Sequence, residues 1–480
     1  MTPKDKSIAQ ITKIAENNKW YIQSANMRTY YNWTCCNSAI DCAHASLGFW
    51  CMRSMKYMEA FLPEDSFNKK AIAELEKQKK DPQHIIKVMN NCEEKSKILH
   101  NFYKKYTKKT IEEFSYNQFY TVLNELDKIN YDYWKIAYLC DLYDPTGSLL
   151  LDNEIKKEKI KLTEKETDIL MKTNWLNYTQ KELLELLEIS SNANNSIKEK
   201  DTLLKKHAKK YFYVDNSWES TKELTIDDFK KKIEEIPSSE KETMLRNLKE
   251  DWDKRREEII KKHNISNSLQ NILFFFRQLF ILRDKRKEHT LITNHYYDLL
   301  FKRLSVLSDI PFEKLRVLLV KDIKPKLDAD YLIDLIEKRK EFVLETYIDG
   351  KNQLFSGKEA EYIYTLLKKQ FESSSNIIKG TTASKGNIKG TVRIIMGESH
   401  FSKFRKGDIL VAPMTRPEYL PIMKKAIGII TDEGGITCHA AIVSRELGIP
   451  CIIGTQIATK TLRDGQIVEL DTKNGIIRII

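Results

Sequence analysis

The sequence predicts a multidomain protein in which a large, mostly α-helical N-terminal region precedes a small α/β domain with β/β/α layers. A chain of 480 residues exceeds what one hydrophobic core usually organises. Before residue 371, apolar residues recur at three- and four-residue spacing, which is typical of helices. From residue 377 to residue 480, short β-rich runs alternate with glycine-containing turns. We therefore expect one domain or region over 1–371 and another over 377–480.

The composition is that of a packed protein, with 41% hydrophobic and 10% aromatic residues. The formal net charge of +12 arises mainly from lysines interleaved with acidic residues, as in the stretch 285–288. Because no arginine/aromatic platform or zinc module accompanies these lysines, we expect no nucleic-acid partner. Phosphorylated small molecules would also suit a mildly basic surface.

The N-terminus lacks a charged and then apolar signal segment, and no segment predicts a membrane span. The most apolar run, Ile272 to Leu282, is short and is interrupted by Arg277. We therefore expect a cytoplasmic protein without a membrane partner. Its eight cysteines are expected to stay reduced, because a large intracellular chain needs no disulfides.

Five potential metal ligands gather in one stretch: Cys35, Cys36, Cys42, His44 and Cys51. Their spacing matches no paired CxxC arrangement. The adjacent cysteines would also point about 100° apart on a helix, so that both could not easily face one ion. Buried thiols packed beside the neighbouring aromatic residues are the alternative. We predict no metal site and leave the role of this stretch open.

Helix signals follow one another along the N-terminal region. The residues 179–182 form a predicted capping box ahead of a leucine stripe. Thr225 is expected to begin a helix that Pro237 ends, and a further helix is expected from near Asp328 through Arg339 and Tyr347, with Gly350 just past its end. No repeat of about 20 to 50 residues is evident, so we predict an irregular helical region of one or two subdomains.

The stretch 372–376 has no apolar anchor and predicts a flexible connection. Six strands are then expected in the C-terminal domain, over residues 391–395, 408–411, 427–430, 451–453, 466–470 and 476–480. The domain is expected to begin near Ile377.

The stretch 431–439 joins an apolar run to a segment of helix-forming composition, which predicts a strand, a glycine loop and a helix start. Gly434 and Gly435 would let the backbone approach an anion, and the first N–H groups of the helix would face it. A neutral imidazole is a competent nucleophile, so His439 is the predicted catalytic residue. Thr437 and Arg445 are further phosphate-binding candidates.

This stretch has two other interpretations. A lone histidine at a helix start is most often satisfied by local hydrogen bonds and has no catalytic role. Cys438 could instead act as a catalytic thiol, but no second histidine is placed to activate it. The surrounding residues favour His439 as a carrier of a phosphoryl group.

The sequence from Thr431 to Pro450 resembles the signature around the phosphorylated histidine of phosphoenolpyruvate-utilising enzymes, such as phosphoenolpyruvate synthase, pyruvate phosphate dikinase and rifampin phosphotransferase. The stretches 380–390 and 407–419 are similar to the family's entry into its swivelling domain and to the strand and loop before the signature. Lys385 stands where the family often has proline, which affects the local turn. The resemblance implies a swivelling phosphohistidine domain over 377–480, tethered by the hinge 372–376.

The resemblance also implies that His439 is loaded at one site and unloaded onto an acceptor at another. The family's ATP-dependent members carry an ATP-grasp domain, and others carry a phosphoenolpyruvate barrel after the histidine domain. Neither is recognisable here, and there is no GxxxxGK[ST] loop. We therefore expect either that a separate ATP-grasp partner protein loads His439 from ATP with Mg²⁺ or that this chain is half of a split transferase. Phosphoenolpyruvate is the other candidate donor.

By analogy with rifampin phosphotransferase, the helical region is expected to bind a small-molecule acceptor that the sequence does not identify. His207, Arg283 and Arg286 are candidate substrate-binding residues, since they lie in two stretches that combine a histidine with cations. Each stretch would otherwise be a solvated helix face. The alternative function is a non-catalytic, phosphohistidine-dependent regulator or scaffold that binds a protein partner.

Overall fold

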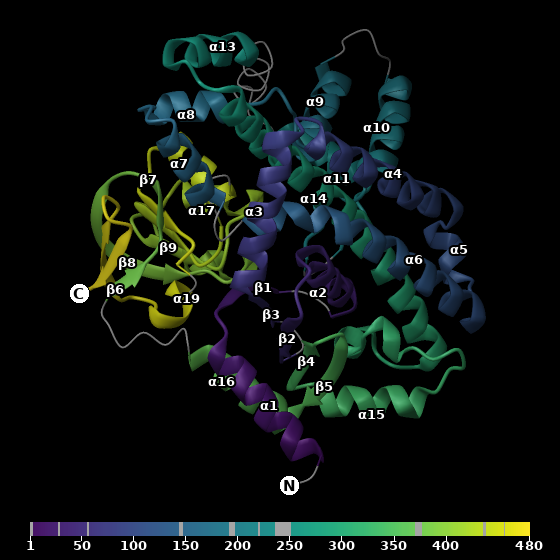
Figure 1. Ribbon diagram of the computed structural model, residues 1–480. Coiled ribbons are helices and arrows are strands. Elements are labelled where there is room, and N and C mark those ends of the chain that lie inside the picture. The colour runs from purple at the N-terminus through teal and green to yellow at the C-terminus, as the bar shows by residue number, and fades with distance from the viewer. Residues whose placement is uncertain are drawn as a thin grey trace.

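The computed structural model describes residues 3–26, 29–54, 57–143, 147–191, 197–218, 221–235, 251–369, 377–434, 438–455 and 457–480. The C-terminal domain lies beside the helical region, at the left of Figure 1 in yellow-green and yellow. Among the described helices, none combines the length and the apolar character that a membrane span requires.

A single long helix, α14 (Asn267–Ser308), is the axis of the N-terminal region. Ser266 caps it by accepting a hydrogen bond from the Leu269 N–H at 3.2 Å. The helix packs against α3 (Glu64–Lys80), α4 (His84–Lys105) and α6 (Tyr116–Ala137). Because these neighbours cover it on several sides, its central part buries polar and charged side chains as well as apolar ones.

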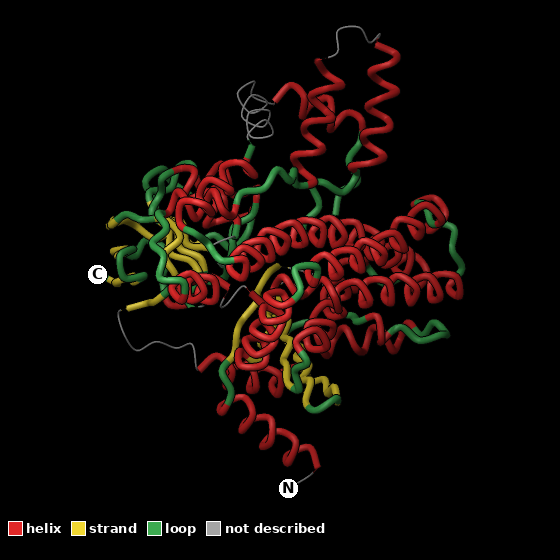
Figure 2. The backbone as a smooth tube through the Cα atoms, turned by 45° about the horizontal axis from the view of Figure 1, so that its top comes forward, coloured by secondary structure: helices red, strands yellow, loops and turns green. Residues whose placement is uncertain are grey.

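Shorter helices surround this axis: α1 (Pro3–Asn17), α2 (Thr29–Ala43), α5 (Lys108–Glu112), α7 (Gly147–Lys157), α8 (Glu164–Met171), α9 (Tyr178–Ser191), α10 (Ile197–Tyr211), α11 (Ile226–Glu235), α13 (Trp252–His263), α15 (Ala329–Arg339) and α16 (Gly357–Lys369). Short 3₁₀ helices span Tyr138–Tyr143, Phe312–Val317 and Val320–Asp322. Helices α9, α10 and α11 enclose a small core of their own, and α9 and α10 project from the main body in Figures 1 and 2.

The N-terminal region is mostly helical as predicted, but it also contains a five-stranded antiparallel sheet that the sequence did not indicate. Its strands are β1 (Trp20–Asn26), β2 (Leu47–Arg53), β3 (Tyr57–Pro63), β4 (Phe342–Ile348) and β5 (Lys351–Ser356), in the order β1-β3-β2-β4-β5. The sheet is buried on both faces. Phe49 packs into the core beside α1 and α16, whereas Trp50 faces the large helical core. A strand that is buried on both faces lacks the alternation of apolar and polar residues by which strands are recognised in a sequence.

The sheet also explains why the helix expected from near Asp328 through Tyr347 begins as predicted, with Asp328 as its N-cap, but ends early. Helix α15 ends at Arg339, and the following residues form β4, which pairs with β2. Gly350, with φ of +80°, lies in the turn between β4 and β5 and does not follow a helix.

Two predicted helix starts are found close to their expected positions. Helix α9 begins two residues earlier than expected, because Asn177 and Gln180 form its capping box, with the Asn177 side chain accepting from the Gln180 N–H at 2.8 Å. Thr225 caps α11 as expected, accepting from the Asp228 N–H at 3.3 Å. Pro237 lies outside the described residues.

The C-terminal domain has strands β6 (Ile377–Lys379), β7 (Thr381–Ser384), β8 (Asn387–Ile394), β9 (Ile409–Ala412), β10 (Gly428–Thr431), β11 (Cys451–Ile453), β12 (Ile467–Asp471) and β13 (Ile476–Ile479). They follow the order β6-β13-β12-β8-β9-β10-β11-β7, with β8 to β11 parallel. The six predicted strands are present within a few residues. Strands β6 and β7 were not among the predicted strands.

The strand residues of this domain alternate between two cores. In β9, Leu410 packs with α17 (Leu420–Met423) and α18 (His439–Leu447). Ile409, its neighbour, faces the antiparallel strands β12 and β13. The domain therefore has the expected β/β/α layers. The predicted hinge 372–376 lies outside the described residues.

Candidate active site

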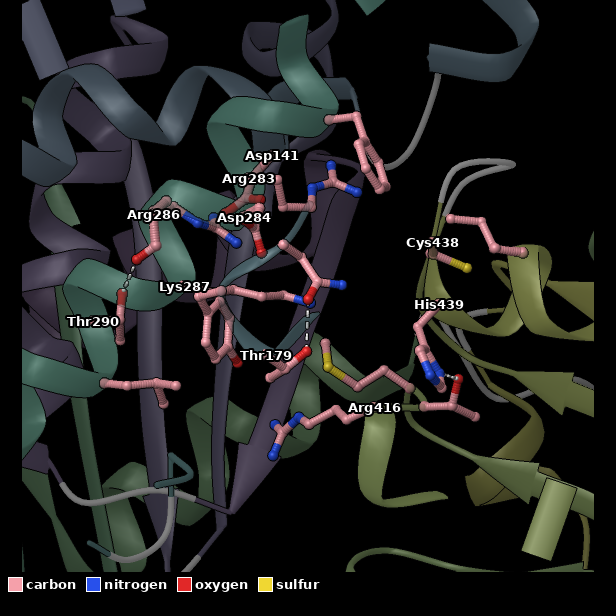
Figure 3. A pocket seen from close by; sticks show the side chains of 18 of the residues that line it. Asp141, Thr179, Arg283, Asp284, Arg286, Lys287, Thr290, Arg416, Cys438 and His439 are labelled. Atoms are coloured by element: carbon pink, nitrogen blue, oxygen red, sulfur yellow. Dashed lines mark hydrogen bonds and ion pairs between the residues drawn. The ribbon is translucent and has the colours of Figure 1, made fainter. Parts of the chain in front are cut away.

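A cavity of about 1280 Å³ lies between the C-terminal domain and the helical region. His439, Thr415 and Arg416 line it from the C-terminal domain. Arg283 and Lys287 line it from α14. Figure 3 shows α14 on one side of the cavity and His439 on the other. The fold thus places the predicted nucleophile opposite a basic surface of a different domain.

His439 is the first residue of α18, which follows β10 after a short loop, as the sequence predicted. Cys438 is the N-cap residue, and its Sγ accepts a hydrogen bond from the Ala441 N–H at 3.4 Å. Gly434 has a φ of +111°, and a Cβ built on it would lie 2.7 Å from Cys438 Sγ. Only glycine therefore fits where the loop passes the start of the helix.

The environment of the His439 ring favours the neutral imidazole. Burial, and then the positive charge of Lys287, lower the pKa of His439 from the ordinary 6.5 to about 4. Its Nδ1 atom lies 2.9 Å from Thr415 Oγ1, while no described residue is hydrogen-bonded to Nε2. If Nδ1 donates its proton to Thr415, the lone pair of Nε2 is free for nucleophilic attack.

Basic side chains form the opposite wall of the cavity. Arg283 donates a hydrogen bond to the Cys140 carbonyl at 2.8 Å, and Arg286 is paired with Asp141. Burial, followed by repulsion from Arg283 and Arg286, lowers the pKa of Lys287. Within the described residues Lys287 forms no ion pair, and Figure 3 shows its side chain extending into the cavity. A bound anion would relieve this repulsion.

The structure brings some of the other candidate residues to the cavity and leaves one elsewhere. Arg286 and Arg445 both line it, and Arg445 Nε lies 3.7 Å from Asp168 Oδ1 of α8. His207 is fully buried within the α9–α11 core, where Glu182 and Glu185 lie 3.2 and 3.4 Å from its ring nitrogens. It therefore does not reach the cavity.

Gly435 and Thr437 lie outside the described residues, so their phosphate-binding roles stay predictions. Sequence reasoning did not select Thr415, Arg416, Asp284 or Lys287 as site residues. The sequence did contain signals for all four. Thr415 and Arg416 belong to the family-like stretch 407–419, and Asp284 and Lys287 directly follow Arg283 and Arg286.

An ion-pair cluster around the buried Glu59 joins the two domains away from the cavity. Glu59 of β3 is 1% exposed, and its Oε1 lies 2.9 Å from the Nζ atoms of both Lys368 and Lys460. Burial alone would raise the pKa of Glu59, but the two lysines outweigh it and lower this pKa to about 2. Lys460 belongs to α19 (Ala458–Thr461), so the cluster holds the C-terminal domain in this position.

The cysteine-rich stretch shows no metal-site geometry among the described residues, where no group of three or more potential ligands could hold an ion. All eight cysteines are free thiols. Cys35, Cys42 and Cys51 are buried, and burial raises the pKa of each thiol.

Comparison with known proteins supports the interpretation of the C-terminal domain. Residues 404–475 match the family model described as "PEP-utilising enzyme, mobile domain". A probable phosphoenolpyruvate synthase of Archaeoglobus fulgidus is 54% identical over 101 residues, which is 21% of this chain and 13% of that protein. The phosphoenolpyruvate synthase of Pyrococcus furiosus is 50% identical over 108 residues, or 22% of this chain and 13% of that protein.

A third relative, the uncharacterized phosphotransferase YvkC of Bacillus subtilis, is 43% identical over 123 residues, covering 26% of this chain and 15% of that protein. A crystal structure of aconitase X from Thermococcus kodakaraensis aligns with a TM-score of 0.19 and 20% identity, over 22% of this chain and 98% of that one. The matched segment spans only about an eighth to a sixth of the curated relatives. The predicted resemblance is nevertheless confirmed, since the C-terminal part of this chain is similar to the mobile domain of phosphoenolpyruvate-utilising enzymes.

Proposed function

We propose that this protein is a phosphotransferase component in which His439 receives a phosphoryl group and passes it to a small-molecule acceptor held in the cavity. The observation that carries the proposal is the position of His439, which faces Lys287 and Arg283 of α14 across that cavity. A concave site in which cations of α14 face His439 supports a transferase and does not resemble the flat apolar surface that a scaffold would present.

In the loading step, His439 Nε2 forms a bond to the phosphorus of the donor. The bond from phosphorus to the leaving oxygen breaks, and that oxygen takes the electron pair. Nδ1 keeps its proton throughout, directed at Thr415 Oγ1. The low pKa of His439 keeps Nε2 unprotonated at neutral pH, so no base is needed to activate it.

The cations opposite His439 would stabilise the charge that develops on the phosphoryl oxygens during transfer. Lys287 and Arg283 approach from the helical region, and Arg416 approaches from the C-terminal domain. Because Arg283 is already fixed by its hydrogen bond to the Cys140 carbonyl, this group needs little reorganisation when the negative charge arrives.

Loading requires a second position of the C-terminal domain if the donor binds elsewhere. We propose that ATP and Mg²⁺ are supplied by a separate ATP-grasp protein, with phosphoenolpyruvate as the alternative donor. The domain would then break the contact between Glu59 and Lys460 when it leaves the cavity.

The test uses phosphoramidate, a small donor whose P–N bond transfers phosphoryl groups to imidazoles. Uptake on His439 is followed by intact-protein and tandem mass spectrometry. Replacing Lys287 with Gln is expected to slow uptake at least tenfold, because a cation beside the transferring group is removed.

The matched control is Lys285→Gln on the same helix. Lys285 is paired with Glu93 at 2.8 Å and does not line the cavity. This variant is expected to stay within twofold of the wild type. Equal rates in the two variants, or no uptake on His439 at all, would contradict the proposed function.

A further inference from the structure

We propose that Asp284 is the general base that removes the proton from a hydroxyl acceptor while the phosphoryl group leaves His439. This inference rests on the proposed function and adds to it both a catalytic residue and the chemical class of the acceptor. It assigns a role to the one carboxylate that α14 contributes to the wall of the cavity.

The contacts of Asp284 leave it available for this role. It is 8% exposed and lines the cavity on the same helix as Arg283 and Lys287. Its Oδ2 atom accepts a hydrogen bond from the Trp175 indole N–H at 2.9 Å, which fixes the carboxyl group. No lysine, arginine or histidine of the described chain lies within ion-pair distance of it. A buried carboxylate that lies among cations without pairing is unusual for a purely structural residue.

The protonation of Asp284 suits proton transfer near neutral pH. Burial raises its pKa from the ordinary 3.8 to about 6, although the Trp175 hydrogen bond and Lys287 act in the opposite direction. The charged and titratable groups that interact with it are Lys287 and Glu288 of α14 and Tyr178 and Lys181 of α9. Other such groups line the same cavity, namely Arg283 and Arg286 of α14, Asp141 of the 138–143 helix, and Arg416, Glu418 and His439 of the C-terminal domain. A base is most effective when its pKa lies near the working pH.

In the proposed unloading step the phosphoryl group passes directly from His439 to the acceptor oxygen. The acceptor oxygen attacks phosphorus, the bond between phosphorus and His439 Nε2 breaks, and its electron pair returns to Nε2. The acceptor proton moves to the Asp284 carboxylate, which later releases it to water. His439 leaves as a neutral imidazole that still carries its Nδ1 proton beside Thr415.

This arrangement favours a particular kind of acceptor. A hydroxyl group has a proton to lose and therefore gains from a neighbouring carboxylate. An acceptor oxygen that is already anionic needs no base, and Asp284 would repel it. We infer that the natural acceptor presents a neutral hydroxyl group, with water as the simplest member of the class.

The experiment starts from protein phosphorylated on His439 with phosphoramidate, and it uses water as the acceptor. Loss of the phosphoryl group is followed by intact mass between pH 5 and pH 8 for the wild type, Asp284→Asn and Asp284→Glu. The Asn variant keeps the size of the side chain and can still accept from Trp175. Near-ultraviolet circular dichroism checks that each variant is folded.

At pH 8 the wild type is expected to lose the group at least tenfold faster than Asp284→Asn, with Asp284→Glu restoring part of the difference. At pH 5, where Asp284 is protonated, the wild type and the Asn variant are expected to converge. If Asp284→Asn matches the wild type across the whole range, the inference is wrong even though His439 is phosphorylated. Failure of His439 to accept the group would instead overturn the proposed function.

Discussion

Replacing Gly434 with alanine should destabilise the protein more than replacing Gly448, at the other end of α18, with alanine. At φ of +111° an alanine is strained by about 1–3 kcal/mol. The new Cβ would also lie 2.7 Å from Cys438 Sγ, so this side chain must move away from the Ala441 N–H that it caps. Loss of a cap costs about 1 kcal/mol, which gives a total of about 2–4 kcal/mol.

Gly448→Ala is the matched control. Gly448 ends α18 in the left-handed region with φ of +65°, and nothing lies within 4 Å of a Cβ built there. Its replacement therefore carries backbone strain alone, of about 1–2 kcal/mol. Gly448 also lies at the opposite end of the helix from His439.

The two variants are compared by urea unfolding and by the rate at which phosphoramidate phosphorylates His439. We expect Gly434→Ala to lose more unfolding free energy and to slow phosphorylation at least tenfold, whereas Gly448→Ala keeps the wild-type rate within twofold. Equal effects of the two substitutions on phosphorylation would refute the steric argument at Gly434.

Three further predictions concern the surroundings of His439 and the contact between the domains. Thr415→Val should leave the fold unchanged but slow phosphorylation about fivefold, because it removes a hydrogen bond to Nδ1 worth about 1 kcal/mol; an unchanged rate would exclude this role. Lys287→Met should raise the pKa of His439 above 4 towards 6.5, since it removes a neighbouring positive charge, and NMR titration of the imidazole measures the shift. The wild-type ring should remain neutral until the pH falls to about 4. Glu59→Gln should loosen the docked position of the C-terminal domain by about 1 kcal/mol, because it removes the ion pair between β3 and the solvent-accessible Lys460, and a spin-label distance distribution between the domains should broaden accordingly.

Local sequence signals predicted the C-terminal domain well because its key features are formed by neighbouring residues. The strand before residue 432, the glycine loop and the helix that begins at His439 all follow from one continuous stretch. Short β-rich runs bounded by glycine-containing turns likewise indicated the strands of this domain, including β9.

The N-terminal sheet could not be predicted in the same way, because it depends on pairing between distant parts of the chain. Strand β2 lies between β3 and β4, which are separated by nearly the whole helical region. Its residues are buried on both faces, so Phe49 and Trp50 gave no period-two signal. The wrong helix over 340–347 has the same cause, since β4 is a strand only because β2 is beside it.

The candidate site shows the same limit, because its residues come from distant parts of the chain. Arg283 was selected from a local cluster of charges, and the fold places that cluster opposite His439. His207 was selected by the same kind of signal, yet its helix turns the ring into a separate core. Charge clustering indicates which residues are candidates, whereas the packing of helices decides which of them face the nucleophile.

The most direct test of the account is to locate the phosphoryl group after incubation with a physiological donor. The full chain is incubated with phosphoenolpyruvate, or with ATP, Mg²⁺ and an ATP-grasp partner protein, and is then analysed by tandem mass spectrometry under alkaline conditions that preserve phosphohistidine. The account predicts one acid-labile phosphate on His439, absent from His439→Ala. Phosphate on the His439→Ala protein in the same amount, or phosphate on another residue of the wild type, would contradict it.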